Sequence, residues 1–178
     1  MKEMTDDLMT TASLLRPDPD SHVVSDAVRK HFTVYIASSR RYLADVRLLH
    51  GLLLVVDAKI KVLDWTIKSL DAREDVDQCD EVFSFCRNAS MFGDLVIYFG
   101  ASGQDAGVQV GMAYAAGVPI LGIKGIGEKP GIMLNGAVTV WKSILETPRV
   151  VQIMANCRMP NCRACPYINS CYVGQPTT

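Results

Sequence analysis

The chain has 178 residues, 49% of them hydrophobic, which is enough for one hydrophobic core and leaves no room for a second full domain. Its 18 Lys and Arg against 19 Asp and Glu give a formal net charge of −1, and no run of five like charges occurs, so no nucleic acid or anionic membrane is expected as a partner. The acidic, polar start lacks the basic and apolar regions of a secretory signal, and no apolar stretch reaches ~18 residues. We therefore expect a soluble, cytoplasmic protein.

Residues 1–30 are predicted to be a flexible lead followed by a short helix. Two prolines in the run Arg16-Pro17-Asp18-Pro19-Asp20 block a helix there, so this stretch should be extended. Ser21 can then cap a short helix over residues 23–30.

Residues 31–147 are predicted to form one α/β domain. Short β-branched and aromatic runs at residues 32–37, 60–63, 95–99 and 119–123 have the length of strands, and residues 137–140 are a candidate fifth strand. Apolar residues recur at helical spacing between these runs, as in the predicted helix at 107–116. Such alternation requires right-handed crossovers, so we expect a three-layer, flavodoxin/Rossmann-like parallel sheet of four to five strands. Thr147-Pro148 can open a last helix within residues 148–178.

A ligand site is expected outside the carboxyl ends of the strands, where open parallel sheets bind their ligands. Three predicted loops meet there, and the loop after residue 99 combines glycines with the amides of a helix start, which favour an anion. Small residues at Gly107, Gly111, Ala113 and Ala115 should let the following helix pack close to the sheet. The candidate ligand-binding residues are Ser38, Ser39, Arg40, Asp64, Trp65, Gly100, Ser102, Gly103 and Asp105.

Each candidate also has a purely structural interpretation. The residues Ser38 to Arg40 could cap the next helix, Asp105 could be the N-cap of the helix starting near Gly107, and Trp65 could be a core or rim side chain. Cys79 and Cys86 are interpreted as buried thiols. The three histidines, including His50, lie away from the predicted pocket and are assigned no role.

Four cysteines lie within the last 22 residues, at Cys157, Cys162, Cys165 and Cys171. Intervals of four, two and five residues allow four thiolates to close around one centre. The spacing from Cys162 to Cys171 is similar to the iron–sulfur motif of certain nucleases of the exonuclease superfamily. The tail is therefore predicted to hold either a [4Fe-4S] cluster or Zn, and the remaining alternative is neither centre, which includes disulfides. Such a closed site would fasten the tail to the domain.

Two stretches resemble the nucleoside 2-deoxyribosyltransferase family and its nucleotide N-glycosidase relatives. They are Asp94-Leu95-Val96-Ile97-Tyr98-Phe99 followed by residues 107–120, GVQVGMAYAAGVPI, and Tyr35-Ile36-Ala37-Ser38-Ser39, which is similar to the family's first strand and ligand loop. The resemblance covers about 115 residues, mostly apolar and small. It implies cleavage or transfer at an N-glycosidic bond through a carboxylate nucleophile, often in homo-oligomers.

The sequence departs from the family at two positions that matter for catalysis. The family's nucleophilic glutamate stands two residues before the glycine that matches Gly111, and this chain has Gln109 there. An amide cannot attack an anomeric carbon as a carboxylate does. Cys86 likewise occupies the position of a family aspartate. Gln109 is expected to line the pocket, and Asp105 is the candidate for a replacement catalytic carboxylate.

The leading hypothesis is a nucleoside 2-deoxyribosyltransferase-like protein that binds a nucleoside, a nucleotide or a related ribosyl ligand, with weak or altered N-glycosidic activity. One alternative is a non-catalytic nucleotide sensor or interaction module. The other is a nucleotide-binding domain similar to the Toll/interleukin-1 receptor class, which would need a carboxylate such as Asp71 or Glu74 near strand two.

Overall fold

The computed structural model of the protein describes residues 31–67 and 76–157. Five parallel strands form one sheet in the order β2-β1-β3-β4-β5. This is the flavodoxin-like order of doubly wound sheets, and it reverses between β1 and β3. The predicted parallel α/β sheet is thereby confirmed, with five strands. The strands are β1 (Phe32–Ser38), β2 (Ile60–Leu63), β3 (Leu95–Phe99), β4 (Ile120–Ile123) and β5 (Val140–Lys142).

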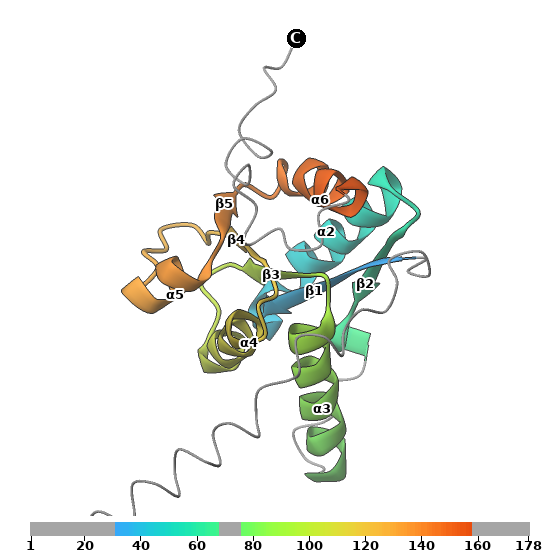
Figure 1. Ribbon diagram of the computed structural model, residues 1–178. Coiled ribbons are helices and arrows are strands. Elements are labelled where there is room, and N and C mark those ends of the chain that lie inside the picture. The colour runs from blue at the N-terminus through green and yellow to red at the C-terminus, as the bar shows by residue number, and fades with distance from the viewer. Residues whose placement is uncertain (1–30, 68–75, 158–178) are drawn as a thin grey trace, which may run out of the picture. The chain divides into compact units, whose positions relative to one another are not determined.

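Helices cover both faces of the sheet (Figure 1). α2 (Leu43–Val56) and α6 (Thr147–Asn156) pack on one face, and α3 (Val76–Phe92) and α4 (Gln104–Ala115) pack on the other. α5 (Ile132–Ala137) follows β4, and the short 3₁₀ turns η2 (Arg40–Tyr42) and η3 (Trp65–Ile67) follow β1 and β2. No helix in the described ranges has both the length and the apolar character needed to cross a membrane.

Alternation along the two central strands produces two separate cores. Val34 and Ile36 of β1 face α2 and α6, whereas Tyr35 and Ala37 face α3 and α4. Burying such a side chain contributes roughly 1.5–3 kcal/mol for a large aliphatic residue. Helix α6 completes the first core through buried side chains that include Val151. The last predicted helix, opened by Thr147-Pro148, is thus confirmed and belongs to the core of the sheet domain.

Helix α4, the fifth strand and the short helix α5 differ from the sequence-based expectations. Helix α4 begins at Gln104 and not near residue 107, because Gly103 already has the extended backbone of an N-cap. The fifth strand is residues 140–142 and not 137–140, because the short helix α5 extends to Ala137. Six residues of mixed apolar character are too few for periodicity to reveal such a helix.

The expected role of the small residues of α4 is only partly correct. Ala113 is fully buried against the sheet, but Gly107, Gly111 and Ala115 are exposed. A Cβ atom added at Gly107 or Gly111 would meet no atom within 4 Å. Close packing on the sheet therefore comes from alanine and valine, and these two glycines are not needed for it.

Candidate functional site

A pocket of about 610 Å³ lies between α3 and α4, beyond the carboxyl end of β1. It is therefore next to the β1/β3 reversal of strand order, where ligands bind in sheets of this class. Segments far apart in sequence contribute to it. The residues that line it are Ser38, Ser39, Arg40, Trp65, Cys79, Val82, Phe83, Cys86, Arg87, Gly103, Asp105, Ala106, Val108, Gln109 and Met112.

Two polar atoms at this pocket are buried without a hydrogen-bond partner among the described residues. They are the Oγ atom of Ser39 and the Oε1 atom of Gln109. Leaving a buried polar atom unpaired costs roughly 1–3 kcal/mol, so native structures usually satisfy such atoms. Both residues also line the pocket, so a molecule bound there is the candidate partner for these atoms.

The Ser39 backbone is held while its hydroxyl is left unpaired. The Ser39 amide donates to Ser102 Oγ at 2.9 Å, and Ser38 Oγ donates to the Ser39 carbonyl oxygen at 3.0 Å. Neither the Ser38 nor the Ser39 hydroxyl caps the turn that follows, since Ser39 is the N-cap of η2 without a side-chain cap bond. Ser39 therefore occupies the N-cap position of η2, but its hydroxyl does not cap the turn.

The loop after β3 is fixed by a chain of hydrogen bonds. Ser102 Oγ donates to the Phe99 carbonyl oxygen at 2.7 Å, and the Ser102 amide donates to the Tyr98 hydroxyl at 3.1 Å. The Tyr98 hydroxyl in turn donates to Glu128 Oε1 at 2.7 Å. Burial, followed by this bond to Glu128, raises the pKa of Tyr98, so the phenol remains a donor. Ser102 thus holds the loop and does not itself line the pocket.

Gly100 is the point at which this loop turns. Its φ of +70° favours glycine, and an added Cβ atom would lie 2.7 Å from the Tyr42 ring. Gly100 therefore allows close contact with Tyr42 and does not line the pocket, whereas Gly103 lines it at the start of α4.

Asp105 and Gln109 both line the pocket from α4. They are four residues apart, so they lie on one face of the helix, one turn from each other. Because Gly103 is the N-cap, Asp105 lies in the first turn, and the interpretation of Asp105 as the N-cap is wrong. Asp105 is exposed, whereas Gln109 is half-buried. Gln109 thus faces the pocket, as expected.

A buried thiol, Cys86, interacts with the Asp105 charge and with Tyr35 of the sheet. Burial raises the pKa of Cys86, the Asp105 charge raises it further, and the neighbouring Tyr35 hydroxyl opposes these two effects. Burial and the neighbouring Cys86 likewise raise the pKa of Tyr35. The buried Tyr35 hydroxyl has no hydrogen-bond partner among the described residues. Cys86 is therefore a protonated thiol in the pocket wall. It is buried as predicted, but Cys79 is exposed, which corrects that interpretation.

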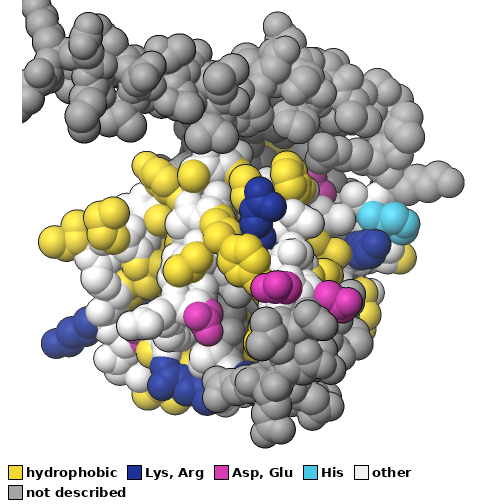
Figure 2. Space-filling model, turned by 90° about the horizontal axis from the view of Figure 1, so that it is seen from below, with side chains coloured by type: hydrophobic (Ala, Val, Ile, Leu, Met, Phe, Trp, Pro, Cys, Tyr) yellow, Lys and Arg dark blue, Asp and Glu magenta, His cyan; other side chains and the backbone are white. Residues whose placement is uncertain are grey.

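Two arginines and an apolar wall complete the pocket. Arg40 follows β1 and Arg87 lies on α3, so their guanidinium groups outnumber the single lining carboxylate. Phe83 and Val108, on α3 and α4, are 55% and 54% exposed although they line the pocket. Figure 2 views the molecule from the side of α3 and α4, and apolar side chains gather in the centre of that face. The pocket is therefore an open one with apolar surface at its mouth.

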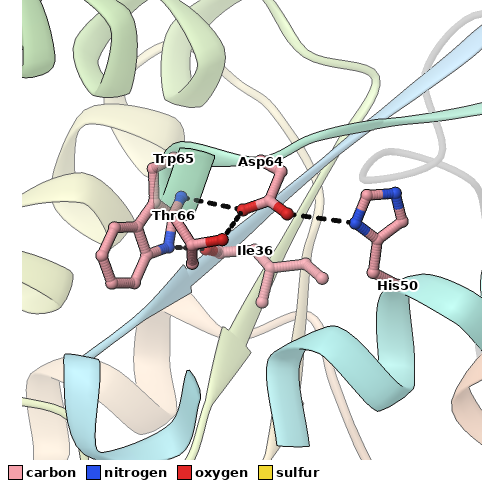
Figure 3. Close-up of polar contacts among 5 residues, drawn as sticks. All are labelled: Ile36, His50, Asp64, Trp65 and Thr66. Carbon is pink, nitrogen blue, oxygen red and sulfur yellow. Dashed lines mark hydrogen bonds and ion pairs between the residues drawn. The ribbon is translucent and has the colours of Figure 1, made fainter. Parts of the chain in front are cut away.

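Trp65 and Asp64 have different roles although they are adjacent. Trp65 is 8% exposed, lines the pocket and donates from Nε1 to the Ile36 carbonyl oxygen at 3.1 Å, which makes it a core residue at the pocket rim. Asp64 does not line the pocket. Its carboxylate accepts from the Thr66 amide and hydroxyl at 2.8 and 2.6 Å and lies 3.2 Å from His50 Nδ1 (Figure 3). His50, to which the sequence assigned no role, is thus a partner of Asp64.

Asp94, from the stretch that carries the family resemblance, is structural. Its Oδ2 atom accepts from both the amide and the hydroxyl of Thr33 at 2.7 Å. Asp94 precedes β3, so this bond joins the amino-terminal ends of β1 and β3, at the edge opposite the pocket.

Several predicted residues lie outside the described part of the chain. Cys157 ends α6 and is partly exposed, but Cys162, Cys165 and Cys171 are not described, and neither are Asp71 and Glu74. Within the described ranges, no group of three or more His, Cys, Asp or Glu side chains could hold a metal ion.

The contribution of α3 to the pocket was not predicted from the sequence. Val82, Phe83 and Arg87 line it together with Cys86. The helical spacing of the apolar residues predicted that this segment is a helix. It did not indicate which of the helix's side chains would line a pocket. Cys86 was expected as a buried thiol and as the replacement of a family aspartate, but not as a pocket residue.

No protein-family model matches the sequence, and no match is found among the curated proteins. Similar solved structures include the following three. A 2-deoxyribosyltransferase from the psychrotolerant bacterium Bacillus psychrosaccharolyticus is 17% identical with a TM-score of 0.56, over 65% of this chain and 90% of its own. A conserved protein from Enterococcus faecalis V583 is 13% identical with a TM-score of 0.56, over 68% and 98%. A CMP N-glycosidase from Clostridium botulinum is 18% identical with a TM-score of 0.46, over 68% and 98%.

The likeness to the 2-deoxyribosyltransferase agrees with the resemblance that the residues indicated. At such low identities the agreement concerns the fold. The described sheet and its helices therefore have the fold of a 2-deoxyribosyltransferase.

Proposed function

We propose that this protein binds a nucleoside, a nucleotide or a related ribosyl ligand in the pocket between α3 and α4, and that its N-glycosidic activity differs from that of the family it resembles. The observation that carries this proposal is the pair of buried, unpaired atoms at the pocket, Ser39 Oγ and Gln109 Oε1. A sugar hydroxyl or a base edge offers the hydrogen-bond partners that these atoms lack.

The remaining pocket surface suits the other parts of such a ligand. The apolar side chains of α3 and α4 can pack against a base, with Trp65 at the rim. Arg40, Arg87 and the uncapped amides at the start of α4 favour a phosphate. The shared fold with a 2-deoxyribosyltransferase supports the same ligand class.

Binding can be tested with the four common ribonucleosides, their 2′-deoxy forms and the 5′-monophosphates of both. We expect at least one to raise the unfolding temperature, and mass spectrometry of the heat-released supernatant to show any copurified member of the class. Arg40→Ala should weaken binding of monophosphates. Arg47→Ala, at an exposed position of α2 away from the pocket, is the matched control. A clean supernatant and no shift with any compound would refute the proposal and favour an interaction module.

A further inference from the structure

The charge and spacing of the polar groups on α4 suggest how the pocket could act on a bound ligand. Asp105 is the one carboxylate among the described lining residues, and Gln109 lines the pocket one helical turn further along α4. Asp105 is exposed, so water reaches its carboxylate, whereas Gln109 Oε1 is buried and unpaired. The two side chains thus present two hydrogen-bond acceptors, one at the mouth and one inside.

A water molecule has two hydrogens and can donate to both acceptors at once. Held in this way, it directs an oxygen lone pair away from α4, toward whatever fills the pocket. A covalent route would instead need a carboxylate nucleophile and a second acid–base carboxylate close to it. The described lining supplies one carboxylate, and Cys86 is a thiol that its surroundings keep protonated.

We propose that Asp105 and Gln109 bind a water molecule between them and that Asp105 removes its proton as the water attacks the anomeric carbon of the ligand, so that the protein is a hydrolase and not a glycosyl transferase. This inference rests on the proposed function, because it takes a nucleoside or nucleotide as the substrate. It assigns Asp105 as the general base and Gln109 as the residue that positions the water.

The reaction balances without any further reactant. The water oxygen forms a bond to the anomeric carbon as the bond from that carbon to the base nitrogen breaks. One proton of the water passes to Asp105, and the departing nitrogen takes a proton from solvent, which reaches the open pocket. Asp105 then returns its proton to solvent. The products are the free base and a sugar or sugar phosphate with a hydroxyl on the anomeric carbon.

The test measures release of free base from each compound that binds in the thermal-shift panel. Asp105→Asn should lower the rate by at least about 100-fold, the smaller end of the effect of losing a general base, with the dissociation constant changed by less than about threefold. Asp45→Asn removes the acidic residue in the first turn of α2, away from the pocket, and should leave the rate unchanged. Adding formate should restore part of the rate of Asp105→Ala, because formate can act as an external base, and a merely structural role would not respond to it.

Direct attack by water also determines the anomeric configuration of the sugar product and excludes exchange of the base. Proton NMR at early times should show the inverted anomer, and an added free base should not be incorporated. A retained anomer, exchange with the added base, or an Asp105→Asn variant as fast as the wild type would overturn the inference. Compounds that bind but are never cleaved would also overturn it, while leaving the proposed binding intact. The absence of any binding would instead refute the proposed function itself.

Discussion

The indole nitrogen of Trp65 donates to the backbone carbonyl oxygen of Ile36 at 3.1 Å. Strand β1 continues to Ser38, but its neighbour β2 is paired only as far as Leu63, opposite Tyr35. The indole therefore takes the place of a ladder hydrogen bond beyond the end of β2. Trp65→Phe should lower the free energy of unfolding by about 1–3 kcal/mol, because a buried carbonyl loses its donor. Urea unfolding measures this change.

Trp141 supplies the matched control for this substitution. Its indole N–H donates no hydrogen bond among the described residues, and its ring packs edge-on against Tyr98 and under the Lys124 ammonium. Trp141→Phe keeps an aromatic ring there, so its effect should be the smaller of the two. Equal losses of stability would mean that the Trp65 hydrogen bond contributes nothing beyond the packing of the ring.

The sheet could be predicted from the sequence because its signals are local. The apolar run of β3 and the alternation of strand and helix are visible in the residues themselves, and they require a parallel sheet. The short helix α5 and the exact start of α4 could not be predicted, since they depend on a few backbone angles at Gly131 and Gly103.

The site could be predicted only in outline. Ser39, Arg40 and Trp65 follow predicted strands, so they were expected at one edge of the sheet, and they do line one pocket. The family resemblance added Gln109. Asp64 also follows a strand, but its side chain turns toward His50 and Thr66, which no sequence spacing indicates. The contribution of α3 depends on tertiary packing, so it became visible only in the structure.

Helix α4 carries a glycine that its packing does not require. Gly111 is exposed, and an added Cβ atom would meet nothing within 4 Å. Gly111→Ala should therefore raise the free energy of unfolding by about 0.5–1 kcal/mol, the usual advantage of alanine in a helix. Gly100→Ala should do the opposite, since its φ is +70° and its Cβ atom would overlap the Tyr42 ring. Thermal unfolding of both variants is the measurement, and a destabilising Gly111→Ala would contradict the packing described for α4.

Asp64 gives the fold an acid-sensitive contact. Burial alone would raise the pKa of Asp64, but hydrogen bonds from Thr66 and His50 outweigh burial and hold the pKa below its ordinary value of 3.8. A carboxyl group with a lower pKa in the folded chain stabilises it above the unfolded-state value, and this stabilisation is lost as pH falls through the folded-state pKa. Asp64→Asn should therefore be destabilising at pH 7, and its difference from the wild type should shrink below about pH 4.

Urea unfolding of both proteins between pH 3 and 7 checks this expectation. Asp45→Asn, at an exposed position of α2, controls for the change in net charge. A difference between Asp64→Asn and the wild type that stays constant over the whole range would show that the Asp64 carboxylate is not stabilised in the folded chain.

We propose that Cys157, Cys162, Cys165 and Cys171 bind one metal centre. Four thiolates can contribute about 10–16 kcal/mol of apparent binding free energy at neutral pH, whereas the sheet domain has its own two cores. Cys165→Ser should therefore abolish metal binding and leave the unfolding temperature of the sheet domain nearly unchanged. Cys79→Ser, at an exposed position of α3, should keep the metal.

Anaerobic purification followed by metal and sulfide analysis distinguishes the two candidate centres. About four iron and four sulfide per chain would identify the [4Fe-4S] cluster, and one zinc per chain would identify a tetrahedral site. Two disulfides in the intact mass, with neither metal present, would rule out both centres.

Gln109→Glu should convert the pocket from hydrolysis toward transfer. The substitution places a carboxylate where the family resemblance expects the nucleophile, on a side chain that lines the pocket. A carboxylate can form a covalent glycosyl intermediate, which a second base can then attack. The half-buried position raises the pKa of the new carboxyl group, so the assay belongs at pH 8, where the group is ionised. We expect a labelled free base to be exchanged into the nucleoside or nucleotide by Gln109→Glu and not by the wild type.

Gln104→Glu, at an exposed position of α4 outside the pocket, adds the same charge and should give no exchange. If Gln109→Glu binds the compound, remains folded and still gives no exchange, Gln109 does not occupy a nucleophile's position, and the catalytic comparison with the 2-deoxyribosyltransferases fails even though the fold is shared.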